Sequence, residues 1–168
     1  MPKIIKLSKI TIALGLYIII SASFARQAWD FFGSRFGQNN IQTVFVLLFF
    51  LAAAFLAFYI FRPGRGFLKA LGSMIVLCFI FIFMSRLEIF VEKIHVFEYG
   101  LLGWLALKDL SCKRSSPMNI FLAFLFVLVV GVIDEGFQRL LPYRVGEVRD
   151  IIINVVSGSC GIAIFLLK

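Results

Sequence analysis

Ionisable side chains gather in the second half of this chain, where they could bind a polar molecule or move a proton. Eight of the nine acidic residues and the single histidine lie between positions 88 and 150. Histidine ordinarily changes charge near neutral pH, and carboxylates can accept or donate a proton in general acid–base chemistry. These properties make three residues the candidate catalytic groups: Glu135, Asp150 and His95.

Further polar side chains accompany these three groups and could hold a substrate. Residues three or four positions apart share one face of a helix, so Tyr99 falls on the face of His95, and Gln138 falls on that of Glu135. An arginine can hold a phosphate or carboxylate through two parallel hydrogen bonds, and Arg144 is placed to do so. The candidate substrate-binding residues are Glu92, Glu98, Tyr99, Gln138, Arg144 and Asn154.

Each candidate also has a structural interpretation, and the residue types leave both open. Glu135 and Asp150 could form ion pairs with Arg139 and Arg144 that lock the loop between two helices. His95 could bridge two carboxylates without taking part in a reaction. The two amide side chains of the set could equally form hydrogen bonds between helices.

A metal site has weak support. Ligands would have to come from carboxylates and one histidine, because the three cysteines are scattered through the chain. His95 and Glu98 stand one helical turn apart, a spacing that suits several divalent ions, but a single histidine without useful cysteines argues against zinc. We therefore assign no metal ligands, and the cofactor stays unknown.

The composition indicates an integral membrane protein. Hydrophobic residues make up 61% of the 168 residues and charged residues 15%, against about 45–50% and about 25% in soluble globular proteins. The mean hydropathy of +1.00 points the same way. A soluble enzyme, a disordered chain and a fibrous protein are excluded. The net charge of +8 comes from basic residues at the ends of apolar runs, which anchor a protein in the lipid bilayer rather than bind nucleic acid.

Six apolar stretches are close to the length that a bilayer crossing requires. They do not alternate apolar and polar residues as the strands of a membrane barrel do, so they are predicted to be helices. The expected fold is all-α, a polytopic transmembrane helical bundle of about six spans in a single domain, residues 1–168. The predicted spans are residues 10–24, 41–61, 67–85, 89–107, 118–137 and 148–167.

The basic residues predict the orientation of these spans. With the amino terminus inside, the inner segments hold ten lysines and arginines and the outer segments hold seven, which favours a multi-pass protein with both termini inside. Asp109 then falls in an inner loop, while the other acidic residues of the second half lie toward the outer side. The first apolar stretch could be a retained helix or a cleaved signal peptide.

The polar positions at residues 88–165 resemble those of VanZ-like membrane proteins. The resemblance rests on two patterns, Glu92-Lys93-x-His95-x-x-x-Tyr99 and Glu135-x-x-Gln138-x-x-x-Pro142-x-Arg144 followed by Asp150-x-x-x-Asn154. Ser157 stands where the family commonly has glycine, and Glu92 where it often has aspartate. The resemblance implies a place in the bacterial cytoplasmic (inner) membrane and a role in the cell envelope. The family's namesake is associated with resistance to the antibiotic teicoplanin, and the resemblance implies no particular reaction.

The polar groups on spans 89–107, 118–137 and 148–167 predict a pocket that opens outside the cytoplasm. It would bind or modify an envelope lipid, a lipid-linked precursor or a glycopeptide-type amphiphile, and whether the protein is an enzyme stays open. The alternative is a non-catalytic structural or partner-docking membrane factor. A small transporter is less favoured, because carriers place polar groups at mid-membrane and this chain gathers them on one side.

Overall fold

The structure is a computed structural model and describes residues 6–60, 66–87, 90–111, 115–142 and 146–168. The described residues are all-α, as predicted, and form seven helices. They are α1 (Lys9–Ser21), α2 (Ala25–Phe36), α3 (Gln38–Ile60), α4 (Phe67–Ser85), α5 (Phe90–Leu110), α6 (Pro117–Leu140) and α7 (Val148–Leu167).

A helix occupies each of the six predicted stretches, and α2 is an additional one. The sequence analysis treated its residues as part of an outer segment between two spans. Three helices in the described part of the chain, α4, α6 and α7, are long and apolar enough to cross a bilayer. Helix α1 is apolar but has only 13 residues. The chain is therefore a multi-pass membrane protein with three candidate spans.

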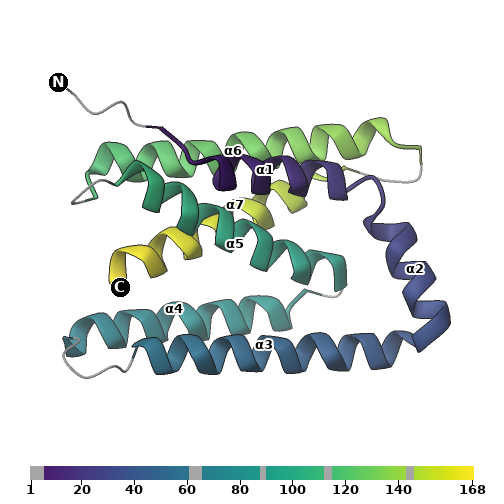
Figure 1. The fold of residues 1–168 in the computed structure, drawn as a ribbon, viewed down its shortest axis with the longest axis horizontal. Coiled ribbons are helices and arrows are strands. Elements are labelled where there is room, and N and C mark those ends of the chain that lie inside the picture. Colours follow the sequence, from purple (N-terminus) through teal and green to yellow (C-terminus); the bar gives the residue numbers. More distant parts are fainter. Residues whose placement is uncertain (1–5, 61–65, 88–89, 112–114, 143–145) are drawn as a thin grey trace.

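Helices α1, α5, α6 and α7 pack together, and α3 and α4 run side by side along one flank of this group (Figure 1). Helix α7 contacts α4, α5 and α6, so it joins the flanking pair to the bundle. Helix α2 runs crosswise at one end of the molecule and links α1 to α3. Its exposed side chains include Phe31, Phe32 and Phe36.

Hydroxyl side chains begin two of the helices. The Ser8 hydroxyl accepts a hydrogen bond from the backbone N–H of Thr11 at 3.3 Å, and the Ser116 hydroxyl accepts one from Asn119 at 3.2 Å. Such caps satisfy N–H groups that have no partner inside a helix. Asp109 adds a tertiary tie, because it accepts from the backbone N–H of Ser8 and from the hydroxyl of Thr11. The prediction that Asp109 lies in a loop is wrong: it belongs to the last turn of α5, where it holds the start of α1.

Four glycines let α5 and α7 approach to backbone contact, and we call them the glycine interface: Gly100 and Gly103 of α5, Gly158 and Gly161 of α7. A Cβ atom at Gly103 would collide with the carbonyl oxygen of Gly158, and one at Gly161 would collide with that of Gly100. Small residues of this kind drive helix packing in membranes, because van der Waals contact replaces the hydrophobic effect there.

We expect Gly103→Ala to destabilise the protein and Gly136→Ala to leave it unharmed. The first change forces a methyl group into the glycine interface, and such overpacking costs about 1–3 kcal/mol. Gly136 is a matched control on α6, since an added Cβ there meets nothing within 4 Å and alanine favours a helix by about 1 kcal/mol. Thermal unfolding in detergent measures both. Equal midpoints for the two variants would contradict the backbone contact.

Candidate functional site

Helices α5, α6 and α7 bring most of the predicted site residues together at one end of the bundle. We call this group the polar cluster, and its members are His95, Glu98, Tyr99, Asp134, Glu135, Gln138, Asp150 and Asn154. All but Glu98 and Asp150 are buried. Burial at this level inside an apolar bundle is costly for polar groups, so the hydrogen bonds of the cluster decide what it can do.

The centre of the polar cluster is a hydrogen-bonded chain from α5 to α6. The Tyr99 hydroxyl donates to one carboxylate oxygen of Asp134 at 2.9 Å, and the Gln138 amide donates to the other at 3.2 Å. Tyr99 and Asp134 have no exposed surface. The pair therefore joins α5 to α6 through a buried carboxyl group.

Glu135 connects the polar cluster to the beginning of α7. The Glu135 side chain is 2% exposed. One of its carboxylate oxygens accepts a hydrogen bond from the Gln138 amide at 3.2 Å. The other accepts one from the backbone N–H of Glu147 at 3.2 Å. Arg139 donates to the carbonyl oxygen of Gly146 at 3.0 Å, so this contact, rather than the expected ion pair with a carboxylate, occupies the Arg139 side chain. Together Glu135 and Arg139 hold Gly146 and Glu147, which directly precede α7, against α6.

His95 and Glu92 have separate partners on their side of the bundle. The Nδ1 atom of His95 lies 3.1 Å from Glu98 Oε2, which confirms that the two share a helix face. Glu92 forms an ion pair with Arg149 of α7 at 3.2 Å. Because Glu92 is buried and Arg149 is about half exposed, this pair links α5 to α7 at the edge of the cluster and gives Glu92 a structural role.

Asn154 differs from the other buried members of the cluster. Its side chain has no exposed surface, yet neither amide atom has a hydrogen-bond partner among the described residues. It packs beside Gly131, where an added Cβ would lie 3.6 Å from Asn154 Cβ and 3.9 Å from the Tyr99 hydroxyl. Leaving a buried polar group unpaired costs about 1–3 kcal/mol. Buried polar groups in native structures nearly always have a partner, so the unpaired amide of Asn154 requires an explanation.

The structure gives less information on two predicted site residues, Arg144 and Asp150. Arg144 lies outside the described residues, so its predicted anion contact stays a prediction. Asp150 is partly buried one turn before Asn154 on α7, and its charge acts on Glu135. No group of three or more histidine, cysteine, aspartate or glutamate side chains that could hold a metal occurs among the residues described.

Asp134 is the residue that the sequence analysis left out of the site. The sequence contained a signal for it, because Val127, Gly131, Asp134 and Gln138 follow the spacing of four, three and four that lines one face of a helix. All four are buried. Gln138 was predicted to lie on the face of Glu135 instead, although a single face can include both neighbouring carboxylates.

The apolar helices and the buried polar cluster define an all-α integral membrane protein whose polar groups gather at one end of three helices. Residues 81–168, just over half of the chain, match the VanZ/LLP1 family, and the chain belongs to that family. The matched region contains α5, α6 and α7 complete, and so the whole polar cluster. No curated protein matches the chain, and no solved structure does.

We expect Tyr99→Phe to lower the thermal stability of the protein. The change keeps the ring but removes the hydroxyl that donates to Asp134, and a buried acceptor that loses its donor costs about 1–3 kcal/mol. Tyr17→Phe is the matched control, because Tyr17 is 53% exposed on α1. Thermal unfolding in detergent tests this, and identical midpoints for the two variants would show that the bond to Asp134 contributes nothing.

Asn154→Leu is expected to leave the stability unchanged or to raise it. Leucine fills a similar volume and removes an amide whose two polar atoms are unpaired within the described structure. The same unfolding measurement applies, with Asn119→Leu at the exposed start of α6 as the control for the change in residue type. A loss as large as that of Tyr99→Phe would mean that the Asn154 amide is paired after all.

Proposed function

We propose that the protein is a bacterial cell-envelope protein that takes the polar head of an amphiphile into the polar cluster. The amphiphile would be an envelope lipid, a lipid-linked precursor or a glycopeptide-type molecule. The observation that carries the proposal is the buried Asn154 side chain, whose donor and acceptor have no partner among the described residues. Removing such a group from water is unfavourable unless something pairs with it.

The chemistry around Asn154 suits a head group that carries hydroxyl or amide groups. An amide offers one acceptor oxygen and two N–H donors, and Tyr99 with its bound Asp134 lies beside it. The carboxylates of Glu98 and Glu135 add acceptors for hydroxyl or ammonium protons. Arg144, if it lies near the cluster as the sequence predicts, would hold a phosphate.

An enzymatic version of this function assigns proton transfer to Glu135, Asp150 or His95. Each is an acid–base group, and all three belong to the same cluster. Arg144 would then stabilise negative charge that develops on the substrate. A sequence motif for a covalent nucleophile was not found, so the step would be a proton-assisted transfer or hydrolysis rather than one with a covalent intermediate.

We further propose about six spans with both termini inside and the polar cluster at the extracytoplasmic side of a bacterial cytoplasmic membrane. Support comes from the helix found in each of the six predicted stretches. It also comes from the count of basic residues, with ten lysines and arginines in the predicted inner segments and seven in the outer ones, because an excess of basic residues is typical of the cytoplasmic side.

A structural function is the second candidate, and one observation favours it. Glu135 and Arg139 both bind the backbone at the start of the α7 segment, as residues that fasten a loop would do. In that case the polar cluster holds the bundle together or shapes a surface for a partner protein, and effects on antibiotic resistance would be indirect. A small transporter is a weaker candidate, because the cluster lies toward one end of the helices.

Lipid analysis of cells that express matched variants tests the proposal. We expect wild type to change the profile of envelope lipids or lipid-linked precursors, and Glu135→Gln and Asn154→Leu to lose that change at equal protein levels. Glu147→Gln is the matched control, because its side chain is exposed and its backbone N–H, which Glu135 binds, is retained. Teicoplanin susceptibility of the same strains provides a second measurement.

The outcomes separate the alternatives. If folded Glu135→Gln has the wild-type profile while Asn154→Leu does not, the cluster binds the amphiphile without Glu135 acting in a reaction. If both folded variants retain the wild-type profile, the amphiphile proposal fails. A structural function predicts instead that the variants with polar substitutions lose protein from the membrane.

A further inference from the structure

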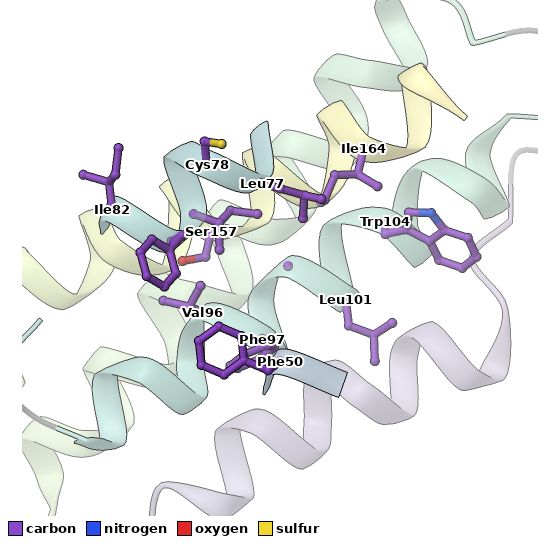
Figure 2. A pocket seen from close by; sticks show the side chains of 14 residues that line it. Phe50, Leu77, Cys78, Ile82, Val96, Phe97, Leu101, Trp104, Ser157 and Ile164 are labelled. Carbon is purple, nitrogen blue, oxygen red and sulfur yellow. The ribbon is translucent and has the colours of Figure 1, made fainter. Parts of the chain in front are cut away.

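An apolar groove lies on the side of the α5–α7 pair that faces α4. Helices α4, α5 and α7, with Phe50 of α3, line this groove of about 600 Å³ (Figure 2). Its walls include Leu77 of α4, Leu101 and Trp104 of α5, and Ile164 of α7. This volume is typical of a site for a small molecule or a lipid chain. Because α4 and α7 are candidate membrane spans, the groove lies where hydrocarbon surrounds the protein.

Two lysines lie over Trp104 of this groove, and a third binds the backbone of one of them. The Nζ atom of Lys108 lies 5.2 Å from the centroid of the Trp104 ring, and that of Lys168 lies 5.5 Å from it. Lys69 of α4 donates a hydrogen bond to the backbone oxygen of Lys168 at 3.0 Å. We call these three residues the lysine group. All three are exposed, so their charges are accessible beside an apolar channel.

The three positive charges of the lysine group outnumber the negative charge of Asp109, the acidic neighbour of Lys108 in the chain. The Asp109 carboxylate accepts hydrogen bonds from Ser8 and from Thr11 of α1. Trp104 packs edge-on against Phe165 at 5.9 Å, and Lys168 lies over the Phe165 ring at 3.9 Å. Tryptophan and lysine together are typical of the level where a helix leaves the hydrocarbon and meets lipid head groups.

We propose that the groove binds a chain of an anionic phospholipid whose phosphate is held by the lysine group. The apolar walls match the chain, and the lysines match the phosphate in charge and in position at the Trp104 part of the groove. Basic residues between membrane helices bind acidic lipid head groups in this way. The lysine group lies at the opposite end of α5 from the polar cluster, and no residue of the cluster lines the groove, so the site does not depend on the proposed function.

Fluorescence quenching in lipid nanodiscs tests the site. The chain has two tryptophans, and a Trp29→Phe background leaves Trp104 as the single reporter. The probes are phosphatidylglycerol and phosphatidylcholine, each with brominated chains that quench tryptophan on contact. We expect brominated phosphatidylglycerol to quench Trp104 at a lower mole fraction than brominated phosphatidylcholine does.

Charge variants test the lysine group directly. Each lysine near a membrane surface favours acidic lipid by about five-fold, so Lys108→Gln and Lys168→Gln should each reduce the preference by about that factor. Lys93→Gln is the matched control, because it makes the same change toward the other end of α5 and should leave the preference intact. Leu77→Phe fills the groove and should abolish the preference without altering the lysines.

Three results would overturn the proposal. Equal quenching by the two lipids would show that the head group is not selected. A preference that survives in the double lysine variant, or that Lys93→Gln reduces equally, would show a general effect of charge. Strong protection of Trp104 from both lipids would indicate that a protein segment, such as a second copy of the chain, covers the groove. Circular dichroism and thermal unfolding would confirm that each variant is folded.

Discussion

The contact of α5 with α7 through backbone atoms is the constraint on which the rest of the molecule depends. At the glycine interface, the helix axes are as close as the main chain allows, and nothing but hydrogen can stand between them. In a bilayer this contact has to supply by van der Waals packing what the hydrophobic effect supplies in water. The polar cluster and the apolar groove are then two sides of one rigid helix pair.

The polar cluster illustrates how a membrane protein can keep charged groups in an apolar bundle. Asp134 and Glu135 each have a hydrogen-bond donor on both carboxylate oxygens, and those donors come from α5, from α6 itself and from the start of α7. Removing one partner from a buried charge is costly, so such a network is mechanically stiff. The Asn154 amide differs from these two carboxyl groups, because neither of its polar atoms has a hydrogen-bond partner among the described residues.

Much of the architecture could be predicted from the sequence, because apolar runs of bilayer length have few alternatives to the helix. The site was partly predictable for the same reason: a helix has a fixed period, so His95, Glu98 and Tyr99 had to share a face. Asp134 was missed because two adjacent carboxylates compete for one face, and only packing against Tyr99 shows which one is central. The contact of Asp109 with α1 depends on a tertiary neighbour that no local pattern contains. Helix α2 was missed although its amphipathic sequence could have indicated a helix.

The sequence also could not predict which acceptor each arginine side chain binds. Arg149 was counted there only as a basic residue of an outer segment, yet it is the cation that pairs with Glu92. Arg139 was expected to face a carboxylate and instead binds a carbonyl oxygen. Long flexible side chains reach any of several acceptors within a turn, so their pairing is decided by the arrangement of whole helices.

In a bilayer crossed by α4, α6 and α7, the crosswise course of α2 would set the depth of the protein. If α4, α6 and α7 cross a bilayer, α2 lies parallel to the membrane plane. Its exposed side chains Phe31, Phe32 and Phe36 could then enter the boundary between head groups and lipid chains. Such a helix resists displacement along the membrane normal in both directions, since its aromatic side chains avoid water and its charged residues, Asp30 and Arg35, avoid hydrocarbon. It lies at the same end as the polar cluster (Figure 1). In such a bilayer the helix would hold the polar cluster at the depth of the lipid head groups.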